Sequence, residues 1–305
     1  MSAADFVLID DRLVPAAEAC VPVSDRGFLY GDAVYETLRA YGGRPFQLPA
    51  HLERLARSAA AIYLRLPWPP AELAARLARL LAANRIDAGR VRITITRGAG
   101  DLRARPEALG PPRLVMTAEP LRPLPDAAYA LGVPVEIAQR PRNLPGALDP
   151  AIKSGNLLNT LLARFEMRDP ASYEVIMLNH QGELGEASLA NLFLVDAAGV
   201  LRTPALASGI LAGITRGLVL ALAREADYAV REDSLPPSAL LSAREAFLTA
   251  STIEILPIAS VDGQPLPAAA GPVTRALQAR YRARVAAELR LHPESETPPG
   301  EGRGR

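Results

Sequence analysis

A short proline-rich segment, residues 119–125, separates two stretches of the chain that each contain strand-like and helix-like patterns. Proline interrupts helices and strands, so such a segment is typical of an interdomain linker. A chain of 305 residues is long enough for two domains, each with its own core. We therefore predict a small N-terminal domain over 1–118, a linker over 119–127, a larger domain over 128–292 and a disordered tail over 293–305.

The pattern before the linker predicts two helices on a small sheet. Apolar residues recur at a helical period over 49–64 and 69–83. Strands are predicted from β-prone runs, with Gly42-Gly43 as a turn, over residues 6–9, 12–14, 33–41, 45–48, 91–96 and 113–117. The N-terminal domain is therefore expected to be a small α/β sandwich.

The pattern after the linker predicts an α/β (α+β) domain with a mixed, barrel-like sheet. Helices are predicted over 156–167 and 214–225. Strands are predicted over residues 133–138, 173–178, 191–195 and 246–249. The most apolar helical stretch, 205–223, is interrupted by Arg216 and contains Ser and Thr, so we expect an interior helix there and no membrane partner.

Charge and composition exclude several classes of function. The net charge is +1 and no basic stripe is interleaved with aromatic residues, so we expect no nucleic-acid partner. The single Cys20 cannot form an internal disulfide, and with His51, His180 and His292 it makes no zinc-type spacing. The start of the chain is acidic, unlike a secretory signal. A cytoplasmic location and no metal site are therefore expected.

Lys153 is the only lysine among the 34 lysine and arginine residues. An arginine guanidinium stays protonated and cannot form a Schiff base, whereas a desolvated amine can. The position that kept lysine is therefore a candidate for amine chemistry, although chance in an arginine-rich composition gives the same count. Lys153 precedes the helix predicted from Asn156, and an electropositive helix N-terminus would favour the neutral amine.

Three further patterns could complete a cofactor site around this amine. Glu186 lies in an acid-rich turn before a strand, where it could keep a pyridine nitrogen protonated. The glycine-containing loop 209–213 opens a helix whose first amides and the Thr215 hydroxyl could bind a phosphate. Further donors are expected from the hydroxyls of Ser251 and Thr252, and Arg54 lies on a predicted helix that also bears Arg57. Each of these patterns is also common as a surface acid, a helix cap or a solvated face, but together they indicate a pyridoxal phosphate site.

The order of motifs resembles the class IV (fold type IV) pyridoxal-phosphate aminotransferases, which include D-amino acid aminotransferase, branched-chain aminotransferase and aminodeoxychorismate lyase. The resemblance extends from Ser24 to about Pro257. It rests on residues 24–32, 34–37, 51–55, 96–98, 153–156, 186–193, 213–216 and 251–252. It implies the two-domain fold of that family, a pyridoxal 5'-phosphate cofactor, amino acid and 2-oxo acid substrates, and a homodimer with active sites near the interface.

The resemblance also implies roles for single residues. Lys153 would bind the cofactor covalently and then move the proton between the substrate Cα and the cofactor C4′. Glu186 would pair with the pyridine nitrogen. Tyr35 would face the substrate carboxylate. Leu211 would pack on the ring and Ser188 would add a polar contact, while the phosphate would be bound by Arg54, Ile214, Thr215, Ser251 and Thr252.

The sequence indicates less clearly which enzyme of this family the chain resembles most. Leu158 stands where branched-chain enzymes typically have Tyr, and Val34-Tyr35 before Glu36 looks more like the D-amino acid enzymes. Exchange of an amino group between a D-amino acid and a 2-oxo acid, by ping-pong chemistry through pyridoxamine phosphate, is therefore favoured. Arg92 with Arg103 could bind two carboxylates, which would suit a 4-amino-4-deoxychorismate lyase. A branched-chain enzyme and a non-catalytic binding protein with this fold are two less favoured hypotheses.

Overall fold

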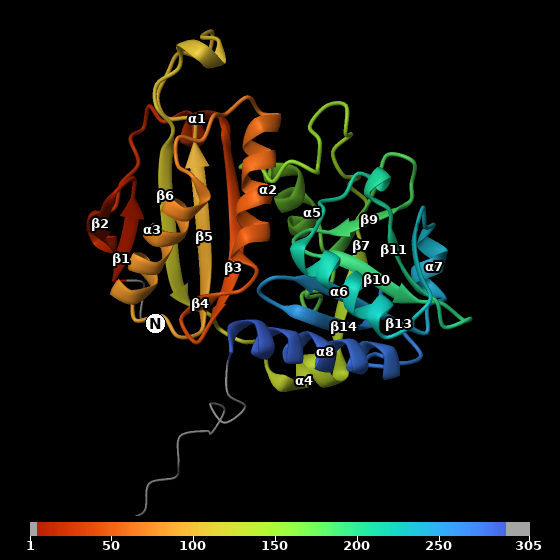
Figure 1. Ribbon diagram of the computed structural model, residues 1–305. Helices are drawn as coiled ribbons and strands as arrows, with labels where there is room; N and C mark the ends of the chain where they lie inside the picture. Colours follow the sequence, from red (N-terminus) through yellow and green to blue (C-terminus); the bar gives the residue numbers. More distant parts are fainter. Residues whose placement is uncertain (1–4, 291–305) are drawn as a thin grey trace, which may run out of the picture.

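The computed structural model describes residues 5–290, which form two sheets lying side by side (Figure 1). The first sheet is antiparallel throughout, in the order β2-β1-β6-β5-β3-β4. Its strands are β1 (Phe6–Ile9), β2 (Arg12–Pro15), β3 (Ala33–Tyr41), β4 (Arg44–Pro45), β5 (Gly89–Thr96) and β6 (Arg113–Pro120). The return strand expected over 45–48 ends at Pro45, because Leu48 already begins the following helix.

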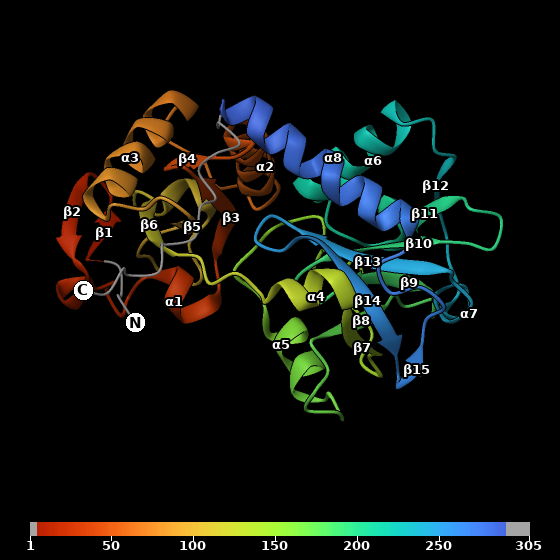
Figure 2. The same cartoon turned by 90° about the horizontal axis from the view of Figure 1, so that it is seen from below.

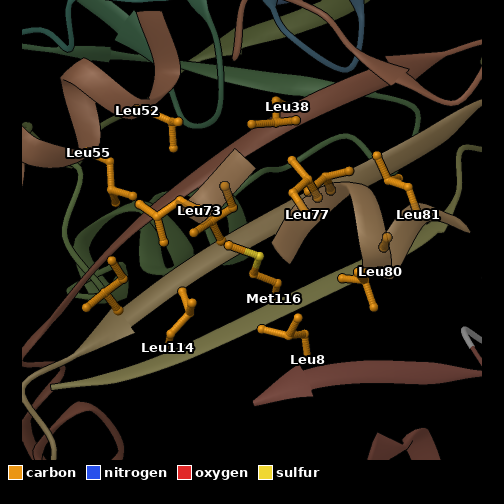
Figure 3. Packing of buried hydrophobic residues seen from close by; sticks show 14 of the residues in the cluster. Leu8, Leu38, Leu52, Leu55, Leu73, Leu77, Leu80, Leu81, Leu114 and Met116 are labelled. Atoms are coloured by element: carbon orange, nitrogen blue, oxygen red, sulfur yellow. The ribbon is translucent and has the colours of Figure 1, made fainter. Parts of the chain in front are cut away.

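Two helices, α2 (Leu48–Ala61) and α3 (Pro70–Ala83), cover one face of this sheet, as the helical period predicted. Each carries proline in its first turn, where the missing amide hydrogen is not needed. Their leucines meet alternate residues of β3, β5 and β6 in a continuous apolar core (Figure 3). A short helix, α1 (Arg26–Tyr30), precedes β3.

The second sheet is mixed and curled, in the order β12-β11-β10-β13-β14-β7-β8-β9, with β15 paired to β14. The pairs β11–β12, β14–β7 and β7–β8 are parallel. Its strands are β7 (Val133–Ile137), β8 (Glu174–Leu178), β9 (Leu184–Ala187), β10 (Asn191–Val195), β11 (Leu201–Pro204), β12 (Val230–Asp233), β13 (Glu245–Ala250), β14 (Glu254–Val261) and β15 (Gln264–Pro265). The expected mixed α/β fold with a barrel-like second sheet is confirmed.

Helices cover the second sheet unevenly. Figure 2 shows α8 (Pro272–Leu289) beside α6 (Ile214–Glu225) and reaching toward β4 and α2. The other helices are α4 (Asp126–Leu131), α5 (Leu158–Phe165) and α7 (Pro237–Leu241).

Between β6 and α4 only residues 121–125 lack regular structure, a shorter connection than the expected 119–127. The predicted tail, 293–305, lies outside the described residues.

Within residues 5–290, no helix is both long and apolar enough to cross a bilayer. The same residues hold no group of three or more His, Cys, Asp or Glu placed to bind a metal ion.

Candidate active site

A cavity of about 370 Å³ lies between the two sheets and has a size typical of small-molecule sites. Its walls come from β3, β5 and α2 on one side and from β9, β10, α6 and the end of β13 on the other. Of the residues predicted from the sequence, those that line it are Tyr35, Arg54, Arg92, Lys153, Glu186, Ser188, Leu211, Ile214, Thr215, Ser251 and Thr252. Segments far apart in the sequence therefore meet at one place.

Lys153 is held in an extended segment against β3. Its carbonyl oxygen accepts from the Tyr35 amide at 2.9 Å, and its own amide donates to the Ser58 hydroxyl at 3.1 Å. The Lys153 Nζ lies 4.5 Å from the centroid of the Tyr35 ring. The predicted helix starts at Leu158 rather than Asn156, so Lys153 precedes its first turn by several residues. Because a helix dipole acts mainly over the first turn, the argument for a neutral amine from a helix N-terminus is wrong.

Glu186 lies inside strand β9, whereas the sequence suggested a turn. Its buried carboxylate forms an ion pair with Arg142 Nη2 at 2.5 Å, and it accepts hydrogen bonds from the Leu211 amide at 3.1 Å and from Asn191 Nδ2 at 2.9 Å. Burial raises the pKa of Glu186 above its usual value, and the positive charge of Arg142 opposes this rise. Arg142 was not predicted from the sequence, since nothing in its local spacing marks it. Asn191 was assigned no role, although it lies within the motif 186–193.

The start of α6, where the sequence predicts an anion site, has unpaired backbone amides. The helix begins at Ile214 after Gly213, and no side chain caps its first amides, which are therefore free to donate. Gly213 is required because a Cβ there would lie 1.9 Å from Asn191 Oδ1. That asparagine also donates to the Leu211 carbonyl at 2.9 Å, so it ties the loop to the carboxylate of Glu186.

Arg54 joins the first sheet to this loop. Its Nη1 donates to the Ala212 carbonyl at 2.9 Å, while Nε and Nη2 each donate to Glu36 at 2.7 Å. Glu36 is fully buried and also contacts His51 Nδ1 at 2.7 Å. Burial alone would raise the pKa of Glu36, but the hydrogen bonds from Arg54 and His51 hold it at about 2. Glu36 and His51 lie within the motifs 34–37 and 51–55, yet the sequence indicated no role for them.

The residues present fit a pyridoxal phosphate. A buried hydroxyl oxygen, Thr249 Oγ1, lines the cavity and has no hydrogen-bond partner among the described residues. It belongs to the end of β13, shortly before Ser251 and Thr252. Thr249 Oγ1 and the uncapped first amides of α6 leave donors unused at one end of the cavity, as a bound phosphate requires. Ser251 and Thr252 add hydroxyls beside them. Glu186 supplies a carboxylate for the pyridine nitrogen, and Lys153 supplies the amine.

Two arginines of β5 line the cavity on the side of the first sheet. Arg92 stacks on Tyr35, with 3.8 Å between its guanidinium carbon and the ring centroid, and its Nε donates to Thr94 Oγ1 at 3.1 Å. Arg90, which was not predicted from the sequence, also lines the cavity. Arg103 does not join them. It lies on the segment after β5, the yellow excursion at the top of Figure 1, and does not line the cavity.

Ser188 lines the cavity on the side of the second sheet. Its hydroxyl donates to the buried Glu174 and accepts from Arg164 Nη1 at 3.0 Å. A buried acid and a helix α5 arginine therefore fix its direction, which the sequence alone did not indicate.

Comparisons with known proteins agree with this geometry. Residues 33–261 match the family model for Amino-transferase class IV. A D-alanine aminotransferase from Listeria monocytogenes serotype 4b is 35% identical, with 89% of this chain and 93% of that protein covered. A putative branched-chain-amino-acid aminotransferase from Methanocaldococcus jannaschii is 33% identical, with 90% and 95% covered.

Among solved structures, the branched-chain amino acid aminotransferase of Escherichia coli superposes with a TM-score of 0.88. It is 29% identical, and the match covers 96% of this chain and 98% of that one. The names of similar proteins span D-alanine aminotransferase, branched-chain aminotransferase and aminodeoxychorismate lyase, so they leave the substrate open. The chain belongs to the class IV aminotransferases, a family of pyridoxal-phosphate-dependent enzymes.

Proposed function

We propose that this transaminase exchanges an amino group between a D-amino acid and a 2-oxo acid. The observation that carries the proposal is that Lys153 and Glu186 line one cavity together with an uncapped helix start and the Arg54 guanidinium. A carboxylate, an amine and an anion site in one cavity match the three parts of pyridoxal phosphate that a protein must hold.

Different residues of the chain would hold the cofactor and move the substrate proton. The phosphate would be bound by Arg54, the Ile214 and Thr215 amides, the Thr215 hydroxyl, Ser251 and Thr252. Glu186 would hold a proton on the pyridine nitrogen, Leu211 would pack on the ring and Ser188 would contact its polar edge. The bound cofactor supplies an electron sink for the electron pair of the substrate Cα. Lys153 Nζ would then remove and return the proton at that carbon.

Arg92 is the proposed anchor for the substrate carboxylate. It faces the cavity from β5 and forms no salt bridge with a carboxylate among the described residues, whereas its neighbour Arg90 is paired with Glu119 at 2.6 Å. Its stacking on Tyr35 fixes the plane of the guanidinium, which favours a bidentate contact with an incoming carboxylate. Arg103, which the sequence paired with Arg92, has no place in this proposal for the cavity of its own chain.

The preference for D-amino acids rests on two observations. Leu158 stands where branched-chain enzymes typically have a tyrosine, and in the structure it is exposed and does not line the cavity. Similarity to a D-alanine aminotransferase extends over about nine tenths of the chain. A lyase is the second candidate, because Arg90 lines the cavity beside Arg92 and would suit a second substrate carboxylate if it gave up its exposed ion pair with Glu119. A branched-chain enzyme is the third.

A homodimer in the cytoplasm is the assembly that we propose. Exposed apolar side chains gather on α1 and α5 at Phe28, Leu29, Tyr30, Leu158, Leu161 and Phe165. A surface of this kind on a globular protein marks an interaction site. Sedimentation velocity would give the mass in solution, and a monomer at micromolar concentration would contradict the dimer. Fractionation of the producing cells would test the location.

The first test is the visible absorption of the protein reconstituted with pyridoxal phosphate and desalted. We expect a bound-cofactor band that is lost in both Lys153→Ala and Lys153→Arg, since Arg keeps the charge but offers no amine. A band that persists in both variants would contradict the role of Lys153. With the wild type, D-alanine alone should bleach the band. Bleaching only by L-leucine or L-glutamate would favour a branched-chain enzyme, and a band unchanged by every donor would favour the lyase.

A further inference from the structure

A buried chain of hydrogen bonds runs from the first sheet to the phosphate end of the cavity. It starts at Glu36 on β3, continues through His51 on α2, and ends at Ser251 after β13. The contacts are 2.7 Å between Glu36 Oε2 and His51 Nδ1, and 3.3 Å between His51 Nε2 and Ser251 Oγ. His51 is only 1% exposed, so water does not compete for its ring nitrogens.

The direction of this chain follows from the charge of Glu36. Its two oxygens accept three bonds from Arg54 and His51, and its pKa of about 2 keeps it ionised. An ionised carboxylate can only accept, so His51 Nδ1 carries a hydrogen. Burial lowers the pKa of His51 below its usual value, although the contact with Glu36 opposes this shift. The imidazole is then neutral, its Nε2 is bare, and Ser251 donates its hydroxyl hydrogen to it.

A phosphate at this end of the cavity disturbs that arrangement. A phosphate dianion only accepts hydrogen bonds, and Ser251 has a single hydroxyl hydrogen. His51 Nε2 and a phosphate oxygen therefore compete for the same hydrogen. If the serine turns to the phosphate, a buried ring nitrogen loses its partner, which is costly. If Nε2 gains a proton, it donates to Ser251 Oγ, the serine donates to the phosphate, and every group is satisfied.

We propose that His51 is a positioning residue that takes up one proton from solvent when a phosphate monoester binds, and thereby turns the Ser251 hydroxyl into a phosphate donor. The proton forms an N–H bond at Nε2, and no covalent bond to the ligand is involved. The resulting imidazolium lies between the anionic Glu36 and the bound dianion, which favours the charge. The proposal rests on the proposed function, because that function places the cofactor phosphate here.

The surroundings of His51 contain charges of both signs. The groups that face it are Glu36 and Arg39 on β3, Arg54 on α2, Lys153 before α5, Ser251 after β13 and Tyr281 on α8. Arg39 is paired with Glu254 at 2.9 Å, and Arg54 is paired with Glu36. Without a ligand, the positive charges of Arg54 and Lys153 disfavour a protonated His51, even though Arg54 is paired. A bound phosphate dianion adds negative charge nearby and so favours the protonated imidazole.

The test is calorimetric titration of the apoprotein with pyridoxamine 5'-phosphate in two buffers of different ionisation enthalpy. At about pH 8 the ligand phosphate is a dianion, since its second pKa is near 6. We expect about one more proton taken up by the wild type than by His51→Gln, whose side-chain amide can donate to Ser251 without titrating. The affinity of the wild type should fall by up to about tenfold per pH unit above pH 7, and that of His51→Gln should stay flat.

Two further variants separate a relay from a merely structural histidine. His51→Asn keeps a donor toward Glu36 but loses the contact with Ser251, and Ser251→Ala keeps His51 but removes its partner. Both should abolish the extra proton uptake. Equal uptake in wild type and His51→Gln, or retention in Ser251→Ala, would overturn the proposal. Lys153→Ala removes one cation near His51, so this variant should still take up a proton when the ligand binds. Failure of the wild type to bind the ligand at all would instead overturn the proposed function.

Discussion

Arg142 is the single residue that most affects the chemistry of Glu186. Burial raises the pKa of this carboxyl, and the nearby guanidinium is the main influence that lowers it. In Arg142→Gln the opposing charge is gone, so the pKa of Glu186 should rise further and the neutral acid should persist to higher pH. A neutral acid cannot hold a proton on the pyridine nitrogen by charge. We expect kcat/KM at pH 7 to fall by roughly tenfold or more, as when one partner of a buried ion pair is removed.

The pH profile of kcat/KM distinguishes this effect from a loss of folding. Activity of Arg142→Gln should recover as the pH rises through the raised pKa of Glu186, because the carboxylate then forms. Arg142→Lys, which keeps a cation, should resemble the wild type more closely. A uniformly low profile in Arg142→Gln would mean that Arg142 supports the loop rather than the charge of Glu186.

At the scale of elements, helix α8 begins without a side-chain cap of its own and receives one from β13. Glu245 accepts from the Val273 amide at 3.2 Å, the Thr274 amide at 2.8 Å and the Thr274 hydroxyl at 2.7 Å. Glu245→Ala should lower the free energy of unfolding by about 1–3 kcal/mol, because buried donors lose their partner. Glu288→Ala, at the exposed end of the same helix, should change it by less than about 0.5 kcal/mol. Urea denaturation measures both; equal effects would refute the cap.

The elements predicted from the sequence are those whose pattern is local. Helices α2, α3 and α6 and strands β3, β5 and β10 follow from periodicity within one segment. Strand β14 does not, because Pro257 argues against a strand in a sheet interior, yet it pairs there with Phe247. Strand β9 contains Gly185, whose missing side chain allows close approach to the Met177 carbonyl. Such strands depend on their neighbours rather than on their own residues.

The residues of the candidate site likewise include some that the sequence predicted and some that it did not. Lys153, Glu186 and Thr215 stand in recognisable local motifs, and the structure brings them to one cavity. Arg142 contacts Glu186 from an irregular segment 44 positions earlier in the chain, which no spacing rule could anticipate. Arg103 shows the reverse case, because a basic residue after β5 suggested a substrate contact, but the fold carries it away from the cavity of its own chain.

At the scale of the whole molecule, the apolar surface on α1 and α5 adjoins the cavity. Asn156 lines the cavity and donates to the Gly31 carbonyl at 3.1 Å, so it links the segment after Lys153 to the end of α1. Phe165, on α5, is 76% exposed. A second copy covering this surface would exclude water from the region that positions Lys153, so assembly and activity should be coupled.

Phe165→Arg should therefore convert the proposed dimer to a monomer, because a desolvated charge at an apolar contact costs several kcal/mol. Leu131→Arg is the matched control, since Leu131 is 69% exposed but lies at the end of α4, far from α1 in Figure 1. We expect the control to keep the mass and activity of the wild type. Phe165→Arg should lose activity at dilutions where it is monomeric and regain part of it at high concentration. If sedimentation shows the same mass for both variants, the second copy sits elsewhere; if Phe165→Arg is monomeric and fully active, each chain carries a complete site.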